Sequence, residues 1–156
     1  GALRGTGYCT WAVAAALPTA RFEIVGRGAP SVPEAAFGDR IVARGHVADL
    51  AEVFARVRVS VAPLRFGAGM KGKVIASLAH GVPVVTTSIG AEGIGLRHGH
   101  DAMIADSPAA FAAAVRAVHE SEDLWRTLSA NGLALAERAF SRAMAERRIA
   151  RVTEGP

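Results

Sequence analysis

The fold of this protein is decided by residues 57–88, which read VRVSVAPLRFGAGMKGKVIASLAHGVPVVTTS. The stretch begins with one Val-rich run, Val57–Ala62, and ends with another, Pro83–Thr86. Glycines, two lysines and a helix-like run, Val74–His80, lie between them. Short apolar runs bounded by turn residues are typical of buried parallel strands, and strand, loop and helix in this order favour a βαβ unit. The stretch therefore predicts an α/β fold.

The same alternation of strand and helix continues on both sides of this stretch. Further strands are expected at Arg21–Val25, Ile41–Ala43 and Ala102–Ile104. Helices are expected at 49–56 and 107–119, where Asp49 and Ser107 are good N-cap residues. Alternating elements of this kind build a Rossmann-like parallel sheet with helices on both faces.

The last part of the chain predicts helices alone. Helical spacing is kept by Leu124, Leu128, Leu135 and Ala139. Asn131 and Gly132 indicate a kink or a break in this stretch, because glycine costs about 1 kcal/mol inside a helix. We therefore expect residues 1–156 to form a single domain that C-terminal helices close.

Composition excludes several classes of protein. Hydrophobic residues make up 51% and charged residues 21% of the chain, and the net charge of +4 is too small and too dispersed for a nucleic-acid-binding protein. No apolar run reaches the length of about 20 residues that spans a bilayer. The lone Cys9 and the lack of a leader predict a cytoplasmic protein. Peripheral membrane contact through residues 147–151, rich in arginine, is the lesser alternative to a solvated helix face.

Three glycine clusters compete as a phosphate-binding loop. Residues 5–10 and 26–28 are interpreted as ordinary turns, because the first follows no strand and the second runs into Pro30 and Pro33. Residues 66–73 follow one predicted strand, precede a helix and contain both lysines among 18 basic residues. Backbone amides of glycines and lysine ammonium groups suit a diphosphate. The predicted ligands are Gly67, Gly69, Met70, Lys71, Gly72 and Lys73.

Among the other polar residues, some are candidates for contacts in the cleft, and none predicts a metal site or a catalytic triad. Thr86, Thr87 and Ser88 follow a strand and face the same cleft in one interpretation, or make ordinary turn bonds in the other. His98 and His100 lack a third ligand, so no metal site is predicted. No serine lies in a Gly-x-Ser-x-Gly motif, so we predict no hydrolase triad and assign no catalytic residue.

The glycine-rich stretch and its neighbours resemble a known family. The matching words are Val61–Gly67, Gly69–Val74, Ala79–Thr87 and Gly90–Ile94. In this order and spacing they are similar to the C-terminal, donor-binding domain of retaining GT-B glycosyltransferases of the large group 1 set. The similarity covers roughly residues 20–140.

The resemblance implies one half of a bacterial-type hexosyltransferase of carbohydrate biosynthesis. Such enzymes move a sugar from a nucleotide diphosphate to an acceptor held by a separate N-terminal domain, which is absent here, without an obligatory metal or other cofactor. Gly45, His46 and Val47 would lie near the base, and Arg65 and Ser88 are further predicted cleft contacts. Alone, the chain is expected to bind a nucleotide sugar weakly and not to turn over.

Two departures from the family pattern keep alternatives open. Family members carry two glutamates where this chain has Ala68 and Ala76, and the second glutamate holds the ribose hydroxyls. Alanine accepts no hydrogen bond from them. The chain is then either an enzyme with an altered donor preference or a degenerate, non-catalytic nucleotide-binding module. Half of a dinucleotide-dependent oxidoreductase is the third alternative.

Overall fold

The computed structural model describes residues 7–26, 38–65 and 71–141. The strands within these ranges are β1 (Phe22–Val25), β2 (Ile41–Gly45), β3 (Ser60–Ala62), β4 (Val84–Thr86) and β5 (Met103–Ile104). β1 pairs with β2, and the other three form a sheet in the order β3-β4-β5. All the pairings are parallel. Each strand overlaps its predicted range, and β3 begins three residues later than predicted.

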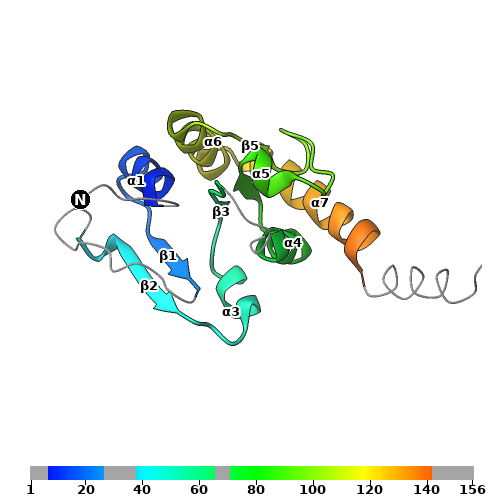
Figure 1. Cartoon of the computed structure of the whole chain (residues 1–156), viewed down its shortest axis with the longest axis horizontal. Helices are drawn as coiled ribbons and strands as arrows, with labels where there is room; N and C mark the ends of the chain where they lie inside the picture. The colour runs from blue at the N-terminus through cyan, green and yellow to red at the C-terminus, as the bar shows by residue number, and fades with distance from the viewer. Residues whose placement is uncertain (1–6, 27–37, 66–70, 142–156) are drawn as a thin grey trace, which may run out of the picture.

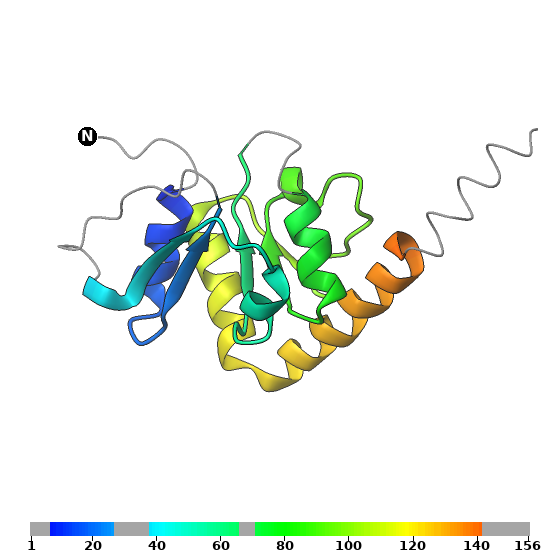
Figure 2. The same ribbon diagram turned by 90° about the horizontal axis from the view of Figure 1, so that it is seen from below.

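Helices cover both faces of these strands. They are α1 (Gly7–Ala16), α3 (Leu50–Phe54), α4 (Lys71–Ala79), α5 (Ser88–Ala91), α6 (Pro108–Glu120) and α7 (Glu122–Phe140), with a 3-10 turn, η1, at Gly38–Arg40. Figure 1 shows α1 and α6 on one side of the strands and α3 and α4 on the other, and Figure 2 shows α7 running along the end of the layer. The predicted Rossmann-like α/β fold is confirmed.

The core has one apolar cluster on each side of β4. Val85 packs with residues of α1, α6 and α7, among them Val13, Phe111 and Leu128. Val84 packs on the other side with residues such as Leu78 of α4. All three residues of β4 are buried, as expected for a strand covered by helices on both faces.

The predicted helix signals are confirmed at the atomic level. The side chains of Asp49 and Ser107 accept hydrogen bonds from the N–H groups of Ala51 and Ala110, at 2.8 and 3.2 Å. Gly81 follows α4 with φ of +69°, the left-handed conformation in which glycine ends many helices. Local sequence therefore fixes where these helices begin and end.

The predicted break at Asn131 and Gly132 is wrong. α7 runs without interruption through both residues. A Cβ on Gly132 would lie 2.8 Å from Leu78 Cδ2 and 3.3 Å from the carbonyl oxygen of Asp101. Asn131 donates a side-chain hydrogen bond to the carbonyl oxygen of His100 at 3.0 Å. The glycine allows close packing of α7 on α4, and tertiary contact outweighs its low helix propensity.

Gly132→Ala is expected to lower the free energy of unfolding by about 1 kcal/mol, although glycine-to-alanine changes in helices usually stabilise. The added methyl group collides with Leu78, which has no exposed surface to retreat into. Gly72→Ala in α4 is the matched control, because a Cβ there meets nothing within 4 Å, and it should stabilise by about 0.5 kcal/mol. Urea denaturation measures the free energy of unfolding, which should fall for Gly132→Ala and rise for Gly72→Ala. Equal changes in the two variants would show that the contact with Leu78 does not oppose a side chain at position 132.

Candidate functional site

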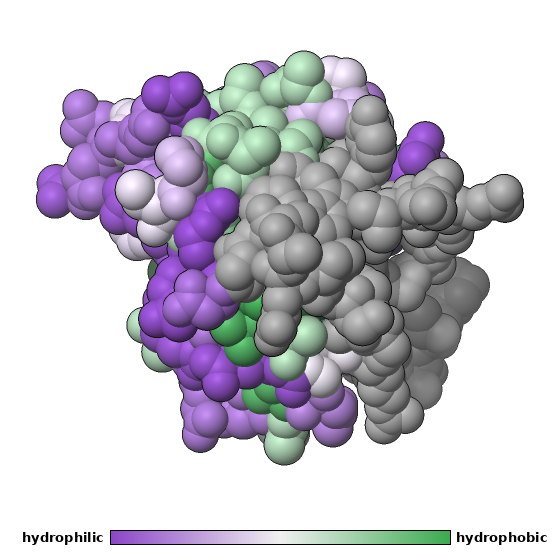
Figure 3. All heavy atoms as spheres, turned by 90° about the vertical axis from the view of Figure 1, so that its left-hand side faces the viewer, coloured by the Kyte–Doolittle hydropathy of each residue, from purple (hydrophilic) through white to green (hydrophobic). Residues whose placement is uncertain are grey.

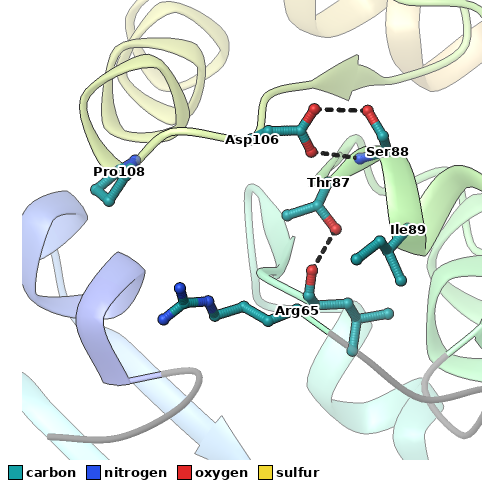
Figure 4. Close-up of a pocket in the computed structure, with 7 residues that line it drawn as sticks. Arg65, Thr87, Ser88, Ile89, Asp106 and Pro108 are labelled. Atoms are coloured by element: carbon teal, nitrogen blue, oxygen red, sulfur yellow. Dashed lines mark hydrogen bonds between the residues drawn. The ribbon is translucent and has the colours of Figure 1, made fainter.

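A pocket of about 610 Å³ opens at the carboxyl ends of β3, β4 and β5. Parallel strands end at the same edge of a sheet, so the segments that follow them meet there. The pocket is lined by Leu64 and Arg65 after β3, by Thr87, Ser88 and Ile89 after β4, and by Asp106 and Pro108 after β5. Figure 4 shows Asp106 and Ser88 together on one wall and the Arg65 side chain extending along another toward α1.

The hydroxyl residues at the end of β4 have different roles. Thr86 and Thr87 are 0% and 4% exposed, and their hydroxyls donate to the carbonyl oxygens of Ala62 and Leu64 at 3.0 and 2.6 Å. These bonds tie the end of β4 to the end of β3. Ser88 alone of the three is exposed. Thr86 therefore serves the sheet, whereas Thr87 and Ser88 both line the pocket, as the cleft interpretation expects.

Ser88 holds a carboxylate in the pocket wall. Its hydroxyl and its N–H both donate to Asp106, at 2.6 and 2.8 Å. These two hydrogen bonds, the hydroxyl bond first, lower the pKa of the Asp106 carboxyl below its ordinary value. The pocket thus has a carboxylate and a guanidinium, from Asp106 and Arg65, together with apolar surface from Leu64 and Ile89. Sequence reasoning missed Asp106, which only β5 brings beside Ser88.

The two predicted phosphate-binding lysines lie in a helix and diverge. α4 begins at Lys71, three residues earlier than the apolar run indicated, so Lys71, Gly72 and Lys73 form its first turn. The Lys71 ammonium lies 3.4 Å from the carboxylate of Glu92, which is 77% exposed. The Lys73 ammonium donates to the carbonyl oxygen of Val25, the last residue of β1, at 3.1 Å. Lys73 therefore bridges to β1, while Lys71 keeps only a weak surface partner.

Two further glycines lie at the carboxyl ends of β1 and β2. Gly26, with φ of +147°, lies beside the tip of the Lys73 side chain, because a Cβ on it would lie 3.0 Å from Lys73 Nζ. Its N–H donates to the carbonyl oxygen of Gly45, at the end of β2, at 2.8 Å. Gly45 is itself left-handed, with φ of +67°, and the exposed His46 follows it. Gly26, which the sequence assigned to an ordinary turn, thus lies beside a predicted ligand, Lys73.

Some of the predicted ligands lie outside the described residues. They are Gly67, Gly69 and Met70, together with Ala68, one of the two glutamate positions. The other glutamate position, Ala76, lies half-buried in α4. Val47 follows His46 and is half-buried.

The model of the family "Glycosyl transferases group 1" matches residues 8–121. The chain belongs to this family. No curated protein matches the chain. The family match covers the end of β1, the end of β2 and the first turn of α4, so the glycosyltransferase domain includes every described site residue.

Several solved structures share the fold of this glycosyltransferase domain. HepE from Anabaena, solved with UDP, superposes with a TM-score of 0.78 at 19% identity over 97% of this chain and 45% of its own. Sucrose-phosphate synthase from Thermosynechococcus elongatus superposes with a TM-score of 0.73 at 23% identity, over 93% of this chain and 41% of the synthase chain. The C-terminal domain of the group 1 protein LpcC from Francisella tularensis superposes with a TM-score of 0.74 at 15% identity, over 87% of this chain and 80% of the LpcC domain. The chain thus spans less than half of the HepE and synthase chains.

The neighbouring histidines His98 and His100 stabilise the segment around β5 in this glycosyltransferase domain. His98 Nδ1 accepts the N–H of Ile104 at 2.9 Å, and His100 Nδ1 lies 2.9 Å from the carboxylate of Asp101. Among the described residues, no group of three or more His, Cys, Asp and Glu side chains is placed to hold a metal ion. None of the helices within the described ranges is long and apolar enough to cross a bilayer.

Proposed function

We propose that this domain binds the nucleotide-diphosphate sugar of a two-domain glycosyltransferase, which transfers the sugar to an acceptor still to be identified. One observation carries the proposal: the end of β1 at Gly26, the end of β2 at Gly45 and the first turn of α4 come together at the carboxyl edge of the strands. Ligands of open parallel sheets bind at this edge. The site therefore lies where a nucleotide is expected.

The groups at the ends of β1 and β2 and in the first turn of α4 suit a diphosphate. The first turn of α4 offers backbone N–H groups without helical partners and the positive end of the helix dipole. Gly26 and Gly45 lack side chains, so a ligand is able to approach the backbone closely. Lys71 adds a cation whose partner, Glu92, is mostly exposed and easily exchanged for a phosphate. These groups would stabilise the leaving diphosphate electrostatically, and no side-chain nucleophile is required.

The neighbouring pocket would take the part of the ligand beyond the diphosphate. Arg65 and Asp106 offer groups that bind sugar hydroxyls or an anionic substituent, and Ile89 and Pro108 offer apolar surface for the face of a ring. HepE was solved with UDP and with UDP-glucose, so we choose a uridine diphosphate hexose as the first donor to test. We propose transfer without a metal or other cofactor.

The whole enzyme would add an N-terminal acceptor-binding domain to this one. We propose that it is of the bacterial type and works in the cytoplasm, with peripheral contact to the membrane. Because catalysis in a GT-B enzyme takes place between two domains, this domain alone is expected to bind the donor weakly and to show no turnover.

Lys71→Ala is expected to weaken UDP binding about tenfold, because one charge-assisted hydrogen bond to a phosphate is worth about 1.5 kcal/mol. Calorimetric titration of the purified domain with UDP, GDP, ADP and their sugars measures the change. Arg116→Ala is the matched control, since it removes a cation paired with Glu120 in the middle of α6 and should leave the affinity unchanged. If none of these nucleotides binds the unaltered domain, the proposed function is wrong.

A non-catalytic nucleotide-binding module is the second candidate, and Ala76 favours it. A glutamate at this position of α4 would accept the ribose hydroxyls, and alanine leaves them unbound.

Ala76→Glu is expected to tighten UDP binding about tenfold and to have little effect on 2′-deoxy-UDP, if the rest of the enzyme pocket is intact. Ala79→Glu is the control, because it adds the same charge at an exposed position of the same helix. Equal effects of Ala76→Glu on both nucleotides would contradict a ribose contact and favour the degenerate module.

A further inference from the structure

The ends of β1 and β2 leave the regular ladder where the proposed donor site begins. The pairing shifts between Ile24 and Val25, because β2 carries one extra residue, Arg44, at that point. Gly26 and Gly45 then take φ values of +147° and +67°, a region of backbone conformation that favours glycine. A bulge of this kind interrupts the ladder and bends the strand, and bulges are frequent next to active sites. The ladder alone therefore does not fix how the two strands end.

Burial holds these strand ends only weakly. It decreases along β2, from Ile41, which is buried, to Arg44, which is exposed. Hydrophilic residues cover much of the described surface on the side of the molecule where β2 lies (Figure 3). None of the residues of β1 is fully buried. The position of both ends therefore depends on polar contacts with a neighbouring element.

Lys73 supplies such a contact from α4. Its ammonium donates to the carbonyl oxygen of Val25, 48 positions away, at 3.1 Å, and a Cβ on Gly26 would lie 3.0 Å from the same nitrogen. The next residue of α4, Val74, is 0% exposed, so the base of the lysine is fixed in the core. Gly26 N–H donates in turn to the carbonyl oxygen of Gly45 at 2.8 Å. One chain of contacts thus joins α4 to the ends of both strands.

The charge of Lys73 is not essential to this contact. Its acceptor is a neutral carbonyl group, to which a neutral N–H group also donates, although more weakly. Lys71 differs, because its ammonium lies 3.4 Å from the carboxylate of Glu92, and that contact depends on charge. The two lysines of the first turn therefore differ in what their side chains contribute.

We propose that Lys73 is a positioning residue of the donor site, which holds the end of β1 against α4 through Val25. This role rests on the proposed function, in which the first turn of α4 binds the diphosphate and the residues after β2 lie near the base. UDP spans both parts, so its affinity depends on how firmly they are held at the matching separation. Inorganic pyrophosphate occupies the first part alone. The sequence assigned Lys73 to the diphosphate itself, so direct binding is the alternative outcome of the test.

Three substitutions separate the hydrogen-bond donor of Lys73 from its charge. Lys73→Arg keeps both a charge and N–H donors, Lys73→Gln keeps donors without a charge, and Lys73→Met keeps neither. The glutamine and methionine variants form the matched pair, because each removes the same charge. Position 73 is only half-buried, so all three variants should fold.

Amide hydrogen exchange followed by NMR measures the hold on the strand end without any nucleotide. Gly26 N–H should exchange about tenfold faster in Lys73→Met than in the wild type, and at close to the wild-type rate in Lys73→Arg. Val85 N–H, in the central strand β4, is the internal reference and should not change. Equal exchange of Gly26 in the wild type and Lys73→Met would overturn the inference, because the strand end would then keep its position without Lys73.

Calorimetric titrations with UDP and with inorganic pyrophosphate test the link to the donor site. Lys73→Met should weaken UDP binding about tenfold, and pyrophosphate binding by no more than about threefold, the effect of one lost charge at longer range. Pyrophosphate should bind Lys73→Gln and Lys73→Met equally. Equal losses of UDP and pyrophosphate affinity in Lys73→Met would overturn the inference, because Lys73 would then bind the diphosphate directly.

The two measurements are linked across the three variants. UDP affinity should follow the protection of Gly26 N–H, so Lys73→Gln should bind UDP more tightly than Lys73→Met in proportion to the protection that it restores. Affinity that follows side-chain charge alone would overturn the inference. Absence of UDP binding to the wild-type domain would count against the proposed function, whereas the exchange of Gly26 would still decide whether Lys73 holds the end of β1.

Discussion

Phe111→Ala is expected to lower the free energy of unfolding by about 3–5 kcal/mol. Phe111 is 1% exposed and lies in the apolar cluster that α1, β4, α6 and α7 share. Removing its ring leaves a cavity that the surrounding helices are able to fill only in part. A small domain is stable by about 5–15 kcal/mol, so this variant should lose a large part of its stability. Urea denaturation followed by circular dichroism measures the loss.

Phe54→Ala is the matched control for removal of an aromatic ring. Phe54 is half-buried at the end of α3, where its ring stacks on His80 with centroids 5.0 Å apart. The transfer free energy and the cavity are both smaller at such a site, so we expect less than half of the Phe111→Ala effect. Equal losses at the two positions would show that the cluster around Phe111 is not the principal core.

Asp101→Ala is expected to destabilise the domain by about 3 kcal/mol at neutral pH. The Asp101 carboxylate is buried, and it accepts hydrogen bonds from Arg97 N and Nε at 3.0 and 3.2 Å. His100 Nδ1 lies 2.9 Å from its other oxygen. These bonds close the turn that leads into β5 and positions Asp106, so the substitution should also weaken UDP binding if that pocket holds part of the donor.

The effect of Asp101→Ala should depend on pH in a defined direction. Burial raises the pKa of the Asp101 carboxyl, but hydrogen bonds from His100 and Arg97 outweigh burial and hold the pKa below its ordinary value of 3.8. The stabilisation is therefore fully present above the ordinary pKa and is lost as the pH falls through the lower, folded value. The stability difference between wild type and variant should stay constant from about pH 7 to pH 5 and shrink below pH 3.8.

Asp39→Ala provides the comparison for this pH dependence. Asp39 is exposed in η1, so its removal should change stability by less than about 0.5 kcal/mol over the same range. Denaturation curves at a series of pH values test both variants. A difference between wild type and Asp101→Ala that grows in acid would show that the hydrogen bonds to Asp101 do not stabilise its charged form.

The parts of the fold that depend on local pattern could be predicted from the sequence. The Val-rich runs at 57–62 and 83–86 became β3 and β4, because a short apolar run between turn residues is stable only as a buried strand. Asp49, Ser107 and Gly81 mark helix ends, because capping bonds join residues at most a few positions apart.

The candidate site depends on longer-range contacts, and local pattern predicted it only in part. Lys71 and Lys73, two positions apart, were expected to act together on phosphate. In the structure one faces Glu92 and the other binds Val25, 48 positions away. Thr87 lines the pocket as expected, but its hydroxyl donates to the carbonyl oxygen of Leu64. Helix geometry points neighbouring side chains in different directions, so their partners depend on which strands lie alongside.

The sequence by itself determined the fold class, the positions of the strands and the family, because each rests on the order and spacing of residues within short segments. Tertiary structure alone decided that Gly26 lies beside the Lys73 ammonium, that Asp106 pairs with Ser88 and that Gly132 packs on Leu78. These features join segments that only the parallel crossovers bring together. The physical reason is that the conformation of a strand or helix depends mainly on its own residues. Which elements lie next to it depends on the packing of the whole layer.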